Sequence, residues 1–279
     1  MSQVELPETV KKLIASQPIE LPIFHPVALK LQRMLSDYDF TVDEVAQVSN
    51  EDQALASQML KMANSPMYMG RTKVATIKEA VIRLGAQQVI NIAIAASQAA
   101  AHASENPALN SYMKALWQHS HGAALGARWL AHNCGMRGIA DEIYLAALLH
   151  DVGKLYLLKA IERLVKAGVI SSMFDDELIR EIFEVMHVEQ GHRLMQHWNF
   201  PAMYCDVVRD HHCEQWDPIN KMLAIVRLVN LACHRIGLGL KHTPVMNLLR
   251  TLEAEVLDLG EMQIAELEAL LEDSRDAEF

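Results

Sequence analysis

The stretch "LAALLHDVGKLYLL", residues 145–158, is almost wholly apolar, yet His150 and Asp151 stand side by side at its centre. A helix that is apolar nearly all round is expected at the middle of a helical domain. Two adjacent polar side chains in such a helix need partners, because burying them alone costs free energy. The stretch therefore predicts a helical core that contains a polar site.

The sequence around this stretch predicts an all-α fold. "TVDE" (41–44) and "TIKE" (76–79) have the Thr-x-x-Glu form of a capping box, and each precedes apolar residues at helical spacing. We find no alternating run with a Gly-rich hairpin turn that would indicate strands. Segments that contain breakers separate the predicted helices at 17–26, 64–72, 103–110, 199–202 and 216–220.

Composition narrows the classes of protein. The chain has 279 residues, of which 51% are hydrophobic and 22% charged, as in soluble globular proteins. Its net charge of −10 argues against nucleic-acid binding. We find neither a signal peptide nor an apolar run long enough to span a membrane, so we expect no membrane partner and a cytoplasmic location. The four cysteines form no C-x-x-C pair, so they indicate free thiols.

Further histidines fall on otherwise apolar faces of successive predicted helices. Each one alone would commonly be a hydrogen-bonded core residue. Together with the His-Asp pair they suggest a metal site, because bundle proteins build such sites from ligands on several helices. Imidazole and carboxylate ligands suit one or two divalent ions such as Fe, Mn, Zn or Ni, and a carboxylate can bridge two ions. The candidate ligands are His119, His150, Asp151, His187, His211 and His212.

The order of these residues carries a family resemblance. A His, an adjacent His-Asp and further His ligands resemble the HD superfamily of metal-dependent phosphohydrolases. In such an enzyme Asp151 would be catalytic, and Lys154 would be the electrostatic partner of a phosphate. The alternative for Lys154 is a solvated or snorkelling lysine.

The N-terminal half resembles the HDOD domain, a signalling relative of that superfamily. The motifs are "LPIFHPVALKLQRML", "VSNEDQALASQMLKMANSPMYM" and "TIKEAVIRLGAQQVINI", joined in the second half by "LWQHS", "EQGHRLMQHWNFP" and "VVRDHH". The resemblance implies one HDOD unit over 15–240, made of a helical part (15–105) and an HD-like part (106–240). Residues 1–14 would be an extension. The tail, 241–279, has the pattern of one or two amphipathic helices that pack on the domain, with a homodimer contact as the alternative.

Two positions depart from the family pattern. Gln53 replaces a proline, and Asn230 stands where catalytic HD enzymes carry their last Asp ligand. An Asn offers a neutral carbonyl oxygen, which is a poorer ligand for a transition-metal dication. The double His is also not followed by the Gly-Tyr-Pro motif of HD-type enzymes that hydrolyse cyclic di-GMP, so we do not expect that activity.

The resemblance implies a bacterial signal-transduction or regulatory protein that acts by protein interaction and carries an HD-like metal site. The alternative is a metal-dependent phosphohydrolase that acts on a nucleotide or other phosphoester. The expected partner is accordingly an unidentified signalling protein or a small phosphorylated ligand. The one candidate for an exposed partner surface is the 64–76 region, with Met67, Tyr68, Met69 and Arg71, although plain loop packing is the favoured interpretation there.

Overall fold

The computed structural model describes residues 12–13, 24–37, 40–65, 68, 70–169 and 176–276, and all regular structure in these ranges is helical. This confirms the all-α prediction. Most of the 1–14 extension and of the 17–26 segment lies outside the described residues. Among the described helices, none combines the length and the apolarity needed to cross a bilayer.

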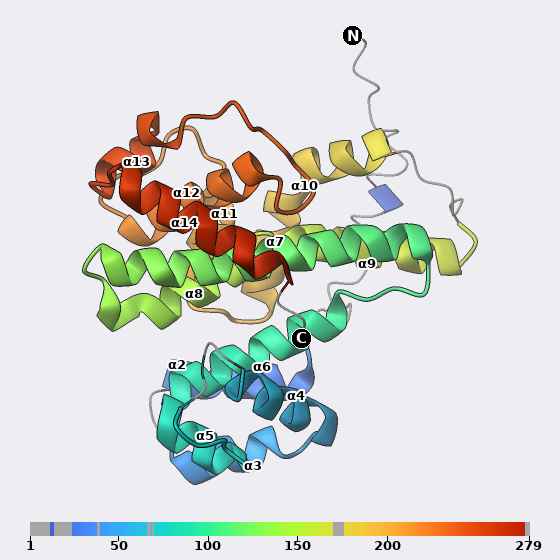
Figure 1. Ribbon diagram of the computed structural model, residues 1–279. Coiled ribbons are helices and arrows are strands. Elements are labelled where there is room, and N and C mark those ends of the chain that lie inside the picture. Colours follow the sequence, from blue (N-terminus) through green and yellow to red (C-terminus); the bar gives the residue numbers. More distant parts are fainter. Residues whose placement is uncertain are drawn as a thin grey trace.

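The helices form two groups (Figure 1). The smaller group is N-terminal and consists of α2 (Pro26–Asp37), α3 (Val42–Ser49), α4 (Gln53–Ala63), α5 (Ile77–Leu84) and α6 (Ala86–Ala101). The larger group is built on the long helix α7 (Pro107–Asn133) and continues through α8 (Ala140–Leu149), α9 (Val152–Lys166), α10 (Asp176–His197), α11 (Ala202–Asp210), α12 (Lys221–Ile236), α13 (Leu252–Val256) and α14 (Glu261–Asp273). The larger group contains every candidate metal ligand.

The predicted capping boxes are present at two helix starts. At α3, the Thr41 hydroxyl accepts from the Glu44 amide at 3.2 Å, and the Glu44 carboxylate accepts from the Thr41 amide at 2.7 Å. Thr76 and Glu79 make the same reciprocal pair at α5. Each box satisfies amides that have no partner within the helix, which fixes where the helix begins.

The 64–72 loop packs against the larger group. The Tyr68 ring is buried, and the Arg128 guanidinium of α7 lies over it, 5.3 Å from the ring centroid. The burial of Tyr68 agrees with plain loop packing and excludes this residue from an exposed partner surface. Arg71 is exposed, whereas Met67 and Met69 lie outside the described residues.

The two groups meet at the first turn of α8. Asn91 of α6 donates to the backbone carbonyl of Asp141 at 2.8 Å, and Arg128 Nε lies 3.4 Å from the Asp141 carboxylate. The opposite end of α8 leads directly into His150. The helix that anchors the N-terminal group thus also supports the polar site.

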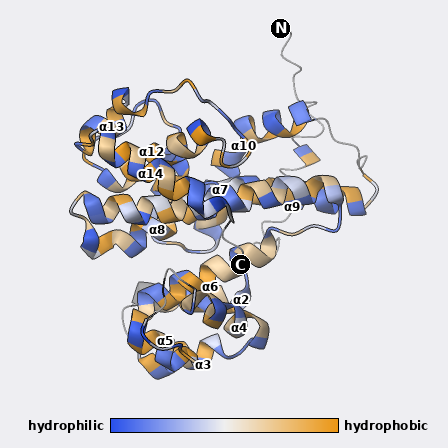
Figure 2. Ribbon diagram, viewed as in Figure 1, coloured by the Kyte–Doolittle hydropathy of each residue, from blue (hydrophilic) through white to orange (hydrophobic). Residues whose placement is uncertain are grey.

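The C-terminal tail packs on the domain, as predicted. Hydrophilic and hydrophobic residues alternate along α14 (Figure 2), and its buried residues are Ile264, Leu267 and Leu271. A methyl group on Gly126 of α7 would lie 3.0 Å from Leu271 and 3.1 Å from Leu267. Gly126, which follows His119 on α7, therefore allows α14 to approach α7 closely.

Candidate metal centre

His150 and Asp151 lie at the junction of two helices. The sequence pattern predicted one continuous helix through both, but α8 ends at Leu149 and α9 begins at Val152. The prediction was wrong because the chain turns at Asp151, with φ −103° and ψ 16°. Both residues are 1% exposed. The break frees their side chains from the 100° spacing of neighbours on a helix, so both face one interior point.

His211 and His212 likewise follow a helix end instead of lying within a helix. Helix α11 ends at Asp210, and the His211 amide donates to the carbonyl of Val207 at 3.0 Å. His211 is buried and His212 is exposed. The predicted helical placement was wrong by one or two residues, and the result is that the two rings differ in access to solvent.

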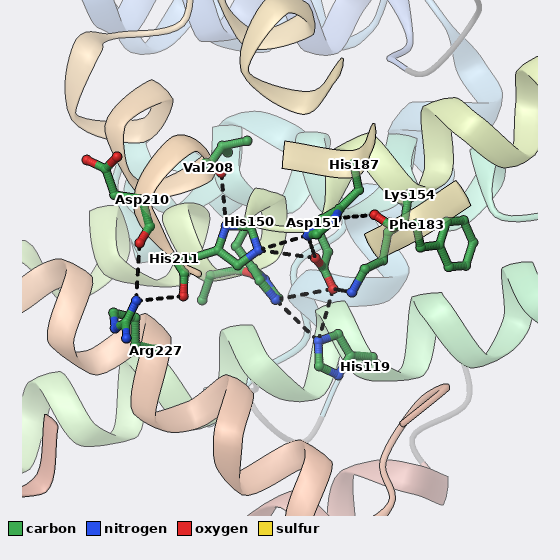
Figure 3. Close-up of polar contacts among 11 residues, drawn as sticks. His119, His150, Asp151, Lys154, Phe183, His187, Val208, Asp210, His211 and Arg227 are labelled. Carbon is green, nitrogen blue, oxygen red and sulfur yellow. Dashed lines mark hydrogen bonds and ion pairs between the residues drawn. The ribbon is translucent and has the colours of Figure 1, made fainter. Parts of the chain in front are cut away.

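The carboxylate of Asp151 lies between four histidines (Figure 3). Its Oδ2 atom is 3.4 Å from the Nε2 atoms of both His119 and His150. Its Oδ1 atom is 3.6 Å from Nε2 of His187 and 3.5 Å from Nε2 of His211. Each carboxylate oxygen therefore faces its own pair of imidazole nitrogens.

All six predicted ligands come together in two overlapping sets, within each of which the donor atoms lie within 4.8 Å of one another. We call the first the His119 group, which consists of His119, His150 and Asp151. We call the second the His187 group, which consists of Asp151, His187, His211 and His212. Asp151 belongs to both groups.

Backbone carbonyls orient the four buried rings. A carbonyl can only accept a hydrogen bond, so the ring nitrogen beside it, Nδ1, carries the proton and Nε2 carries a lone pair. This is how histidine ligands are normally oriented in metal sites. The Nδ1 pairs are His119 with Leu238 at 3.1 Å, His150 with Ala147 at 2.7 Å, His187 with Phe183, and His211 with Val208 at 2.9 Å.

The lone pairs then face one another. Nε2 of His119 is 3.2 Å from Nε2 of His150, and the same atoms of His187 and His211 are 3.4 Å apart. Burial lowers the pKa of His150 and of His187 to about 4, so both rings are neutral at pH 7. Neutral nitrogen lone pairs beside a carboxylate repel each other unless a cation lies among them. The donor set thus fits a divalent metal ion.

Lys154 pairs with Asp151. Its Nζ atom lies 2.6 Å from Asp151 Oδ2, and its side chain is 15% exposed. Burial alone would raise the pKa of Asp151, but the Lys154 ammonium beside it outweighs this effect and holds that pKa well below its usual value. Lys154 is therefore not the solvated lysine that the sequence left open.

Arg227 on α12 supports the His211–His212 segment, and the sequence patterns did not identify it. Its Nη1 atom donates to the carbonyls of Asp210 and His211 at 3.2 and 3.0 Å (Figure 3), and to the carbonyl of Cys213 at 2.9 Å. Its Nε atom donates to Glu253 at 2.7 Å. Arg227 satisfies carbonyls that the end of α11 leaves without helical partners, and so fixes the position of the backbone at His211.

His234, also on α12, is a second residue that the sequence patterns missed. Its ring stacks on that of His119, with centroids 5.6 Å apart and planes 11° apart. Burial lowers the pKa of His234 to about 2. The one available signal was spacing, since His234 lies one turn after Asn230.

A cavity of 190 Å³ adjoins the His187 group. His211 and His212 line one side, and Asn230 and Lys241 also contribute to its lining. Asn230 is 2% exposed, and its Oδ1 atom has no hydrogen-bond partner among the described residues. The residue at which the sequence departs from catalytic HD enzymes therefore borders open space beside the histidines.

Comparisons with known proteins bear on the fold and the family. A solved HDOD domain protein of unknown function from Geobacter sulfurreducens superposes with a TM-score of 0.73 at 24% identity, covering 96% of this chain and 95% of that one. A "Putative metal-dependent phosphohydrolase" from Shewanella amazonensis superposes with a TM-score of 0.67 at 19% identity, covering 96% and 97%. At these identities the likeness shows the fold.

A curated relative from Treponema pallidum, an uncharacterised protein, is 25% identical over 224 residues. The match includes 77% of this chain but 43% of the relative, so the chain spans less than half of that protein's length. The HDOD family model matches residues 21–214, from the N-terminal helical group through the double histidine. The chain belongs to the HDOD family.

Proposed function

We propose that the protein is a bacterial HDOD signal-transduction protein that acts in the cytoplasm by binding another protein, and that its His/Asp cluster is a metal centre that controls its conformation. The observation that carries this proposal is the buried Asp151 carboxylate, whose two oxygens each face two imidazole nitrogens. The cation would be held by His119, His150, Asp151, His187, His211 and His212.

The placement of these ligands supports a regulatory role. They come from α7, the α8–α9 junction, α10 and the end of α11, so a bound ion would tie these helices together. An ion that binds only this arrangement stabilises it, which links metal occupancy to conformation. The neutral Asn230 and the burial of every ligand except His212 fit such a role better than an open catalytic site.

A metal-dependent phosphohydrolase is the second candidate, and the cavity beside the His187 group favours it. At 190 Å³ the cavity is smaller than most ligand pockets, so it suits a small phosphorylated group. Lys241 and the exposed His212 would attract the phosphoryl oxygens. In this role a bound ion would supply electrostatic stabilisation, and Lys154 would contact the phosphoryl group once released from Asp151.

Metal analysis tests the centre. The protein would be expressed in medium supplemented with Fe, Mn and Zn, and its metal content measured beside that of Asp151→Asn and of a control, Asp206→Asn. Asp206 is an exposed aspartate paired with Arg209. We expect metal in the wild type and the control and a loss of metal in Asp151→Asn. A wild-type protein without metal would contradict the proposal.

The regulatory role and the phosphohydrolase activity can be distinguished by whether the protein hydrolyses phosphoesters. The metal-loaded protein would be assayed on a panel of phosphoesters that includes nucleotides. We expect no turnover, together with a fall in melting temperature when a chelator removes the metal. Hydrolysis that Asp151→Asn abolishes and Asp206→Asn retains would establish the second candidate instead.

A further inference from the structure

We infer that this centre takes one divalent ion, in the His187 group, and that the Lys154 ammonium serves as the second cation in the His119 group. The inference rests on the proposed metal centre and specifies its stoichiometry. It assigns opposite states to the two oxygens of Asp151: Oδ1 is available to an ion, and Oδ2 is held by Lys154.

The two groups differ in the number of donors. The His187 group offers three imidazoles and a carboxylate oxygen, which is a full tetrahedral set for an ion such as Zn²⁺. The His119 group offers two imidazoles and a carboxylate oxygen. An ion in the His119 group would need a further ligand from outside that group to complete a tetrahedral set.

The carboxylate oxygens are also used differently. Oδ2, which faces His119 and His150, already accepts a charge-assisted hydrogen bond of 2.6 Å from Lys154. Oδ1, which faces His187 and His211, has no hydrogen-bond partner among the described residues. An ion in the His187 group leaves the Lys154 pair intact, whereas an ion in the His119 group must displace it.

The net charge of the cluster also makes a second ion in the His119 group unfavourable. Asp151 is the one carboxylate in either group among the described residues, so a single dication and Lys154 already exceed its charge. A second dication would add further positive charge to a buried place, where water screens it little. The cost falls on the His119 group, which already contains the ammonium.

Access from solvent also favours binding of the ion in the His187 group. His212 is exposed, so an ion can reach the His187 group from solvent. The side chains of His119 and His150 are 4% and 0% exposed. An entering ion therefore meets the four-donor group first.

The test is a titration of metal-free protein with Co²⁺, followed by the visible absorption of the bound ion and by elemental analysis of the dialysed product. We expect about one tightly bound ion per chain in the wild type. Lys154→Met removes the ammonium while it keeps an apolar chain of similar length. We expect this variant to bind a second ion at least about tenfold more tightly than the wild type does, because a nearby like charge is gone.

Two ligand variants locate the first ion. His211→Ala should abolish tight binding, and His119→Ala should keep one ion, with circular dichroism confirming that both are folded. If Lys154→Met does not fold without metal, the wild-type stoichiometry and this histidine pair still decide the question. Two ions of comparable affinity in the wild type, or loss of the first ion in His119→Ala alone, would overturn the inference and leave the metal centre standing. Absence of binding in every form would overturn the centre itself.

Discussion

Gly153 lies directly against the backbone carbonyl of His187. A methyl group on Gly153 would be 1.9 Å from the His187 oxygen and 2.8 Å from the Gly191 nitrogen. Helices α9 and α10 therefore cross with their backbones in contact. This crossing brings His187 to Asp151, which lies two residues before Gly153, so a glycine without any polar group helps to set the geometry of the cluster.

We predict that Gly153→Ala destabilises the protein by about 1–3 kcal/mol or more, as overpacking in a tight core does. The added methyl cannot be accommodated by turning a side chain, because the atoms that it meets belong to the backbone. Displacement of α10 should also move His187 away from Asp151 and weaken Co²⁺ binding. Urea unfolding and metal titration measure the two effects.

Gly138→Ala is the matched control, since nothing lies within 4 Å of a methyl group at Gly138. We expect its free energy of unfolding to stay within about 0.5 kcal/mol of the wild type and its metal affinity to be unchanged. Equal effects of the two substitutions on stability and on metal affinity would show that the contact between Gly153 and His187 does not determine either quantity.

A second prediction concerns Arg227, which holds the end of α11. Arg227→Met removes the donors to three carbonyls and leaves the carboxylate of Glu253, a 5% exposed residue, without its charge partner. Breaking a buried pair from one side typically costs about 3–5 kcal/mol. We expect a loss of this order in the free energy of unfolding, together with weaker metal binding because the His211 segment is no longer fixed.

Arg209→Met, on α11 itself, provides the comparison. Arg209 is about half exposed and pairs with Asp206 and Asp210. Exposed pairs contribute about 0–1 kcal/mol, so this change should be small. Adding Glu253→Gln to Arg227→Met should recover part of the stability, because it removes the unpaired charge. Metal binding that is unaffected by Arg227→Met would show that this residue supports the fold without positioning His211.

The sequence sufficed to predict which side chains come together, because several of them leave a local signal. His119 precedes small residues on one helical face, and His150 and Asp151 interrupt an apolar run. The signal at His119 depends on helical periodicity, which α7 preserves, whereas the signal at His150 and Asp151 is their polarity within an apolar run. The all-α fold was predictable from helical periodicity as well.

Other features depend on packing between distant segments and leave no local signal. The turn at Asp151 interrupts a long apolar run, and at this turn Gly153 crosses α10 with the two backbones in contact. Arg227 and His234 are ordinary members of an amphipathic helix until α12 is placed against α7 and α11. Tyr68 stands in a loop whose composition indicates exposure, and a contact with Arg128 far along the chain buries it.

A third prediction concerns acid stability, and it follows from buried histidines that remain neutral. Burial lowers the pKa of His102 and of His150 to about 4 and that of His121 to about 3, from an ordinary value of 6.5. Between these values the unfolded chain binds protons that the native state does not. The free energy of unfolding should therefore fall as the pH is lowered from about 6.5 to about 4, and should change little from this cause above pH 7.

Chelator-treated protein isolates this effect, because a bound ion would add its own pH dependence. Urea midpoints at pH 7, 6, 5 and 4 should fall in order. His121 stacks on Trp117 and belongs to neither metal group, so His121→Phe removes one of the contributing protons without changing a ligand. Its midpoint should fall less steeply with acid than that of the wild type, while its Co²⁺ binding at pH 7 stays the same. A wild-type midpoint that is constant from pH 7 to pH 4 would mean that these rings take up protons in the native state as readily as in the unfolded chain, which would contradict their lowered pKa values.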